Sequence, residues 1–112
     1  MTLNQVIRAG LEPLGLPVIP DVDTQHRPRC FTFHYDLLPV QFRDNGPAWY
    51  KALIQIHLFL PLGENSLALV ERTAHALVLA GLTWPEVVDG TDESGQHKIF
   101  ECEALVPLQE KG

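Results

Sequence analysis

Histidines, cysteines and carboxylates are the side chains of this sequence that could bind a metal or transfer a proton. His26, Cys30 and His34 follow one another at intervals of four residues. In an extended strand four residues span about 13 Å, whereas one ion holds its ligands at about 2.0–2.3 Å. The spacing therefore predicts surface or edge positions for these three side chains and no metal site among them.

Two other pairs could take part in acid–base chemistry. His34 and His57 become neighbours if their strands pair, but neither has a serine or cysteine nucleophile with an orienting acid beside it in the sequence. Glu101 and Glu103 share one face of a strand, where carboxylates are usually solvated. No glycine spacing matches a phosphate-binding loop. We expect no catalytic residue, no metal and no cofactor, and we do not expect an enzyme.

The composition excludes several classes of function. The 112 residues carry a net charge of −6, and the eight lysines and arginines are scattered, so no basic stripe is available for sequence-specific nucleic-acid binding. No apolar run approaches the roughly 20 residues that cross a bilayer, and no signal peptide opens the chain, which predicts a soluble protein made in a cytoplasm. Cys30 and Cys102 lie in separate predicted strands, which favours free buried thiols.

Two stretches have the apolar spacing of amphipathic helices. The first begins with Thr2 and Gln5 in capping-box spacing and ends near Pro13. The second is predicted over 66–80, followed by Gly81 and a proline as stop signals. The two apolar stripes are Leu3, Val6, Ile7, Gly10, Leu11 and Leu14 in the first helix, and Leu67, Val70, Ala74, Leu77, Val78 and Gly81 in the second.

Alternation of apolar and polar residues predicts the strands. These are 16–22, 30–38, 49–60, 82–88 and 97–106, with a turn at 89–95. The stretch 49–60 has an unbroken apolar face and is predicted to be the central strand, whereas the prolines of 16–22 predict an edge strand. Residues 39–47 form a polar segment that we interpret as a loop too long for a tight turn and able to reach a partner.

The order of these elements predicts the fold class. It reads α-β-β-β-α-β-β within a length that suits one domain, residues 1–112. Strands that mostly pair with their sequence neighbours, beside two helices, indicate an α+β protein. We expect a single mixed, mainly antiparallel sheet flanked by the two helices.

The apolar residues exceed what two helices can easily cover. Trp49, Leu53, Phe59, Ile99 and Leu105 belong to the second face of the sheet, and Leu69, Ala76 and Ala80 form a minor strip that we expect on the far side of the second helix. A long loop or the opposite helix could close over any single residue of this set. Taken together, they favour an oligomer over a monomer.

Several motifs between residues 31 and 106 carry a family resemblance. They are a Tyr-containing strand, F-x-D-N-x-P at Phe42–Pro47, L-F-x-P at Leu58–Pro61, a helix ending in Ala-Gly, and a closing strand G-Q-H-x-x-F-E-C-E at Gly95–Glu103. In this pattern the chain resembles small tail-assembly proteins of long-tailed bacteriophages, of the tail-terminator or tail-completion type.

This resemblance implies a structural function. Such proteins are small α+β subunits that form rings, typically hexamers, at the end of the tail tube, where they stop tube polymerisation and provide the head-joining surface. The implied partners are other copies of the chain, the tail tube protein and head–tail connector proteins, with no membrane, and the implied location is the virion, after assembly in the host cytoplasm. The alternatives are a head–tail connector or neck protein of the same particle, or a small ligand-binding or enzymatic domain using His34 and His57.

The expected ring contacts come from the 39–48 segment, the second sheet face, one flank of the second helix and the acidic hairpin tip. The predicted interface residues are Phe42, Arg43, Asp44, Trp49, Leu69, Ala76, Asp89, Asp92 and Glu93. At the tip, negative charge facing the lumen of a ring would keep passing DNA from adhering. The alternative for the tip is an ordinary solvated turn.

Overall fold

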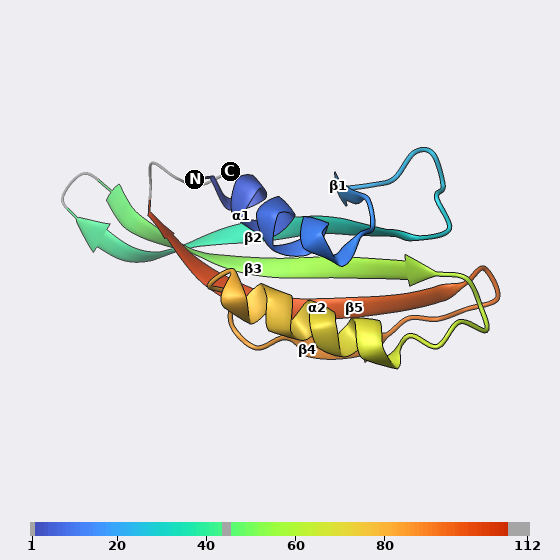
Figure 1. The fold of residues 1–112 in the computed structure, drawn as a ribbon. Coiled ribbons are helices and arrows are strands. Elements are labelled where there is room, and N and C mark those ends of the chain that lie inside the picture. The colour runs from blue at the N-terminus through green and yellow to red at the C-terminus, as the bar shows by residue number, and fades with distance from the viewer. Residues whose placement is uncertain (1, 44–45, 108–112) are drawn as a thin grey trace.

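The computed structural model of the protein describes residues 2–43 and 46–107. Its elements in chain order are α1 (Leu3–Leu11), the short 3-10 helix η1 (Glu12–Leu14), β1 (Val18–Pro20), β2 (Cys30–Arg43), β3 (Gly46–Leu60), α2 (Leu67–Leu79), β4 (Glu86–Asp89) and β5 (Gln96–Pro107). Figure 1 shows these elements as one sheet with two helices packed on it. The predicted α+β class, with two helices beside a single sheet, is confirmed.

The sheet has the strand order β1-β2-β3-β5-β4. β1 runs parallel to β2, and the other three pairings are antiparallel, so the sheet is mixed and mainly antiparallel. β3 is the central strand, as its unbroken apolar face predicts. β1 is an edge strand, so it has β2 as its one neighbour. Its proline, which lacks an N–H, therefore breaks no hydrogen bond to a strand on the other side.

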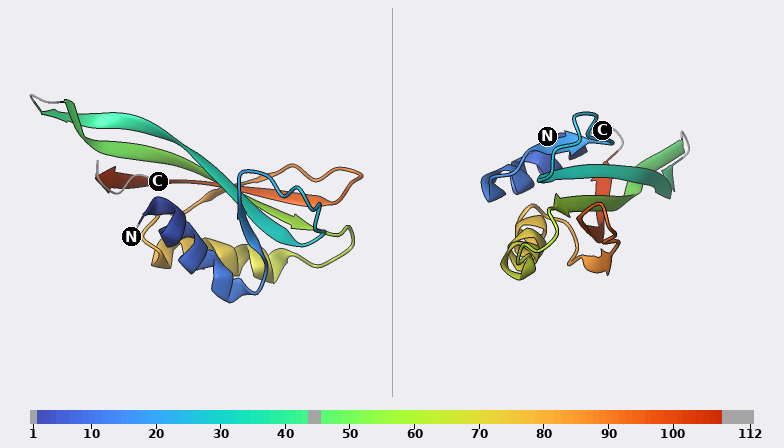
Figure 2. Two further views of the ribbon diagram at one scale, coloured as in Figure 1. Left: turned by 90° about the horizontal axis from the view of Figure 1, so that it is seen from above. Right: turned by 90° about the vertical axis from the view of Figure 1, so that its right-hand side faces the viewer.

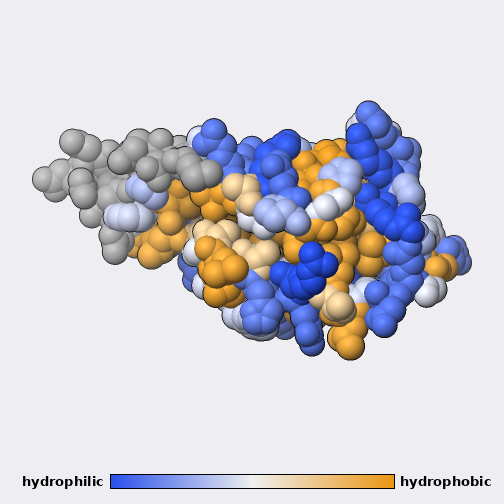
Figure 3. All heavy atoms as spheres, viewed as in Figure 1, coloured by the Kyte–Doolittle hydropathy of each residue, from blue (hydrophilic) through white to orange (hydrophobic). Residues whose placement is uncertain are grey.

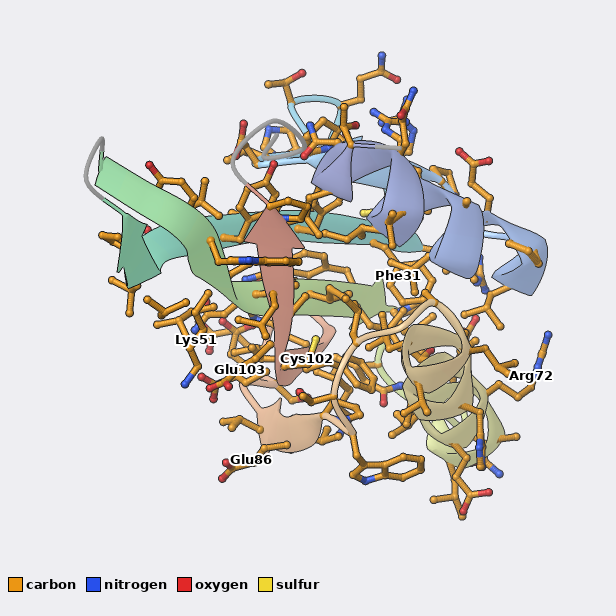
Figure 4. The ribbon with its side chains drawn as sticks, turned by 90° about the vertical axis from the view of Figure 1, so that its left-hand side faces the viewer. Phe31, Lys51, Arg72, Glu86, Cys102 and Glu103 are labelled. Atoms are coloured by element: carbon orange, nitrogen blue, oxygen red, sulfur yellow. The ribbon has the colours of Figure 1, made fainter. Side chains whose placement is uncertain are left out.

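Both helices cover the same face of the sheet (Figure 2). The register aligns Phe33 with Ile56 and Ile56 with Phe100, and all three are almost fully buried beneath the helices. In Figure 4, Phe31 and Cys102 point to the helix side, whereas Lys51, Glu86 and Glu103 lie on the other side. We call this second side, which no helix covers, the open face.

The helices contact each other as well as the sheet. α1 begins with the predicted capping box, in which Thr2 accepts a hydrogen bond from the Gln5 N–H and the Gln5 side chain accepts one from Thr2. A Cβ atom added at Gly10 would lie only 3.0 Å from the Cβ of Ala80. Gly10 therefore allows α1 to approach the end of α2.

The predicted loop at 39–47 is wrong for 39–43 and 46–47, and 44–45 lie outside the described residues. β2 continues to Arg43 and β3 begins at Gly46, with the two residues paired in the ladder. Register shifts near Gln41 carry the pairing past Pro39. β1 pairs only with 31–33, so none of the described strands lies on the outer side of β2 at Pro39 and the missing N–H is tolerated there.

The strand predicted at 82–88 is shorter than expected, because β4 spans only Glu86–Asp89. Upstream of Pro85 the chain runs beside β5 without a regular ladder. Thr83 donates its N–H to the Glu103 carbonyl at 3.1 Å, and the Thr83 hydroxyl accepts the Glu103 N–H at 2.8 Å. Pro85 has no N–H to donate, so regular pairing begins only after it.

No helix in the part of the chain that the structure describes has the length and hydrophobicity to cross a membrane.

Candidate functional site

Three histidines from three strands meet on the open face. His34 lies on β2, His57 on β3 and His97 on β5. His57 Nε2 is 3.2 Å from His34 Nε2, and His57 Nδ1 is 2.7 Å from His97 Nε2. The expected meeting of His34 and His57 is confirmed. We call the three residues the histidine row.

Sequence reasoning missed His97. The β3–β5 ladder places His97 opposite Phe59, one step from His57 on the same face, and the rings of Phe59 and His97 stack with centres 4.5 Å apart. A signal was present in the sequence, because the alternation of residues in 97–106 already placed His97 on the face opposite the core. What the sequence did not provide was the register between β3 and β5, which are separated by α2.

A hollow of about 730 Å³ lies beside the histidine row. Its floor is the open face of β2 and β3, and its rim is formed by the β1–β2 loop and the β4–β5 turn, which lie at the same end of the sheet in Figure 1. The lining residues include Asp23, Arg27, Cys30, Thr32, Phe59 and Asp92, together with the histidine row. The hollow is therefore both polar and aromatic.

Asp23 organises the loop that covers this hollow. Its carboxylate accepts hydrogen bonds from the Arg27 N–H at 2.7 Å and the Gln25 N–H at 3.1 Å, and it pairs with the Arg27 guanidinium at 2.6 Å. Burial acts to raise the pKa of Asp23, but these hydrogen bonds and the Arg27 charge outweigh it and lower the pKa below its ordinary value. The loop is thus held in place by a carboxylate that is ionised at neutral pH.

The histidine, cysteine and acidic side chains of the described residues are the groups that could bind a metal or act as nucleophiles. Within residues 2–43 and 46–107, no group of three or more histidine, cysteine or acidic side chains is arranged to hold one ion. Cys30 and Cys102 are free and buried, and burial raises the pKa of both thiols to about 11. Because the thiolate is the reactive form, neither cysteine has the character of a nucleophile at neutral pH.

Two groups of exposed apolar side chains lie on opposite sides of the domain. The first, which we call the sheet-face surface, is on the open face and consists of Leu38, Leu53, Val88 and Leu105. The Lys51–Glu103 ion pair, at 3.2 Å, lies among them (Figure 4). Leu105 is 63% exposed, so this surface is available to a partner.

The second group, which we call the helix-flank surface, consists of Leu67, Val78, Leu79 and Trp84. Leu79 is 88% exposed and Trp84 62% exposed, and the Trp84 ring meets His75 edge-on with centres 5.3 Å apart. Figure 3 shows apolar atoms at both ends of α2. Val70, Ala74 and Leu77 of the predicted core stripe of α2 are confirmed, whereas Leu67 and Val78, also expected there, are exposed, and Thr73 is buried.

The expected apolar strip on the far side of α2 is wrong in its placement. Leu69 packs against the hydrophobic core. Ala76 and Ala80 face Gly10 of α1, since a Cβ there would lie 3.7 Å from the Ala76 carbonyl oxygen and 3.0 Å from the Ala80 Cβ. Ala76 and Ala80 are thus half-buried beside Gly10 of α1, a contact that the sequence pattern of α2 alone does not reveal.

The other predicted interface residues lie in three places. Trp49 is half-buried on β3. Phe42 and Arg43 end β2, and Asp44 lies outside the described residues. Asp89, Asp92 and Glu93 are exposed around the β4–β5 turn, where hydrogen bonds from Thr91 and then from Lys98 lower the pKa of Asp89 to about 2. Their role as contacts remains a prediction.

No known protein family matches the chain, and no curated protein is significantly similar to it in sequence. The resemblance to phage tail-assembly proteins therefore remains a prediction from sequence motifs.

Proposed function

We propose that this chain is a structural subunit that assembles into a ring, of the tail-terminator or tail-completion type. The observation that carries the proposal is the presence of two exposed apolar surfaces on opposite sides of one small domain. The sheet-face surface contains Leu105 and Leu53, and the helix-flank surface contains Leu79 and Trp84. Exposed apolar patches of this kind are typical of protein interaction sites.

Two different surfaces on opposite sides suit head-to-tail assembly. When one surface of a subunit binds the other surface of the next subunit, repetition closes into a ring if the rotation returns to its start. Trp84 supports this use, since tryptophan is enriched among the residues that dominate binding energy. The Lys51–Glu103 pair would then form part of the polar surroundings of the sheet-face contact.

At the end of a tail tube, such a ring would stop tube polymerisation and provide the surface that joins the head. Its partners would be other copies of itself, the tail tube protein and head–tail connector proteins, and its location the virion. A connector or neck protein of the same particle would share the ring and differ in where it docks. The exposed Asp89, Asp92 and Glu93 would give one part of the ring a negative surface that repels DNA.

The assembly state of the purified protein tests the proposal. Size-exclusion chromatography with light scattering is expected to give a mass above that of the monomer at high concentration. Leu105 lies opposite Lys51 in the ladder, so Leu105→Glu would add a second carboxylate beside the Lys51–Glu103 ion pair. Burial of this excess negative charge in the contact is expected to weaken association by roughly tenfold or more. Leu62→Glu, at a residue that is 54% exposed but belongs to neither surface, is the matched control. A protein that stays monomeric at every concentration, including with tail tube protein added, contradicts the proposal.

Deletion of the gene from its phage tests the biological role. Tails of uncontrolled length, or tails that fail to join heads, are expected. Normal infectious particles without the protein would show that the assignment is wrong.

The hollow beside the histidine row favours a second candidate, a small ligand-binding domain. Its volume of about 730 Å³ falls within the roughly 300–1,000 Å³ of small-molecule sites. Thermal-shift measurements against a metabolite library would test this candidate, for which a reproducible stabilisation that is lost in Phe59→Ala is expected.

A further inference from the structure

The histidine row is arranged as a linear chain of three rings. The ring centres of His34 and His57 are 5.3 Å apart, and those of His57 and His97 are 5.0 Å apart. The facing nitrogens are 3.2 and 2.7 Å apart, so each pair lies almost on the line that joins its ring centres. Two ring nitrogens whose lone pairs point at each other can hold one hydrogen between them. They cannot both direct those lone pairs at a single metal ion.

We propose that His34, His57 and His97 form a hydrogen-bonded imidazole chain that accepts one proton and excludes further ones, so that mild acid loosens the end of the sheet that carries the hollow. This inference concerns a single subunit and is independent of ring assembly.

The capacity of the chain follows from counting its nitrogens. Four ring nitrogens face one another across two contacts, and each contact needs one hydrogen between its two nitrogens. The outward nitrogens of His34 and His97 can carry one hydrogen each. The intact chain therefore holds at most four ring protons. Three neutral imidazoles already hold three, so only one further proton fits. A second would place two N–H groups against each other.

Burial of the histidine row opposes additional positive charge, and the carboxylates around it favour that charge. Burial lowers the pKa of His57 to about 4, with the neighbouring His97 and His34 contributing. Burial also lowers the pKa of His97, although the Asp92 and Asp89 carboxylates partly offset it. The other charged or titratable groups that line the hollow come from the β1–β2 segment and the adjoining end of β2, namely Asp21, Asp23, His26, Arg27 and Cys30. On the open face, Asp36 of β2 and Glu101 of β5 flank the row.

The sign of the pH effect follows from these protons. In the unfolded chain each of the three histidines takes up a proton near its ordinary pKa of about 6.5. In the folded protein the histidine row takes up only one proton, so unfolding in mild acid is accompanied by the uptake of two more. The free energy of unfolding therefore has its full value above about pH 6.5, where the histidines are neutral in both states, and it decreases as the pH falls below that value. In this range the unfolding equilibrium constant rises by up to roughly 100-fold for each pH unit of acidification.

The loosening is expected at one end of the sheet. His97 connects the chain to the β4–β5 turn, where its carbonyl accepts the Gly90 N–H at 2.7 Å and its N–H is donated to the Thr91 hydroxyl at 3.2 Å. His34 and His57 form part of the floor beneath the β1–β2 loop. Repulsion within the row therefore acts on both segments that close the hollow.

Titration of the native protein by NMR, with a chelator present, tests the proposal without any substitution. Following the Cε1–H signals of all five histidines, we expect only one of the three row histidines to titrate near its ordinary pKa. The other two are expected to remain neutral until the protein begins to unfold. Three independent titrations within one pH unit of 6.5 in the folded protein would overturn the proposal.

A series of variants gives a graded second test. The pH dependence of the urea midpoint near pH 5 reports the protons taken up on unfolding. In the native protein the histidine row should account for two of the protons taken up on unfolding. In His34→Ala, which shortens the row, it should account for one, and in His57→Phe, which divides the row, for none. His75→Phe alters a histidine outside the row and should keep the native slope. An unchanged slope in both His34→Ala and His57→Phe would rule out the chain.

Discussion

Ile56 is the residue on which the core depends most directly. It is fully buried and lies between Phe33 of β2 and Phe100 of β5 in the ladder. Ile56→Ala is expected to lower the free energy of unfolding by about 2–5 kcal/mol, because it removes buried methyl groups and leaves a cavity. Urea denaturation measures the change.

Leu79→Ala is the matched control for that substitution. The side chain is 88% exposed, so its loss is expected to change the free energy of unfolding by no more than about 0.5 kcal/mol. Equal effects at both positions would contradict the packing described for β3.

At the scale of elements, the contact between α1 and α2 depends on a missing side chain. Gly10 faces Ala80, and even a Cβ atom at Gly10 would be closer to the Ala80 Cβ than side chains normally approach. Gly10→Val is expected to destabilise the protein by about 1–3 kcal/mol, because the larger side chain forces the helices apart. Thermal denaturation measures the effect.

Ala9→Val places a valine at an exposed position of the same helix and is the control for a β-branched side chain on α1. Because glycine has a poorer helix propensity than valine, propensity alone would favour Gly10→Val, and a gain of stability in Gly10→Val would contradict the helix contact. Ala80→Gly is expected to recover part of the stability lost in Gly10→Val, since it removes the atom nearest to the new side chain.

At the scale of the whole molecule, the proposed head-to-tail contact makes a prediction about mixtures. Leu105→Glu impairs only the sheet-face surface and Leu79→Glu only the helix-flank surface. Each variant alone is expected to be monomeric, because every contact needs one intact surface of each kind. Mixed together, they are expected to form dimers and nothing larger, as measured by light scattering.

This mixing experiment also distinguishes the symmetry of the contact. If the sheet-face surface bound a second sheet-face surface, Leu79→Glu would dimerise alone and mixing would add nothing. Such a result would replace the ring with a two-fold dimer.

The sequence by itself determined the elements that depend on local pattern. The alternation in 30–38, 49–60 and 97–106 identified three strands and their buried faces, and the spacing of Thr2 and Gln5 identified the start of α1. These features could be predicted because side-chain direction in a strand repeats every two residues and a helix cap involves neighbours in the chain.

Only the tertiary structure decided which distant residues meet. The continuation of β2 to Arg43 and the start of β3 at Gly46 depend on irregularities in the register and on an outer edge that no other described strand pairs with, neither of which has a local signature. The contact of Ala76 and Ala80 with Gly10 depends on where α1 docks, and Leu69 packs against a core built from distant parts of the chain. The histidine row depends on two strand registers at once, and a shift of one residue in either would turn a histidine to the opposite face of the sheet.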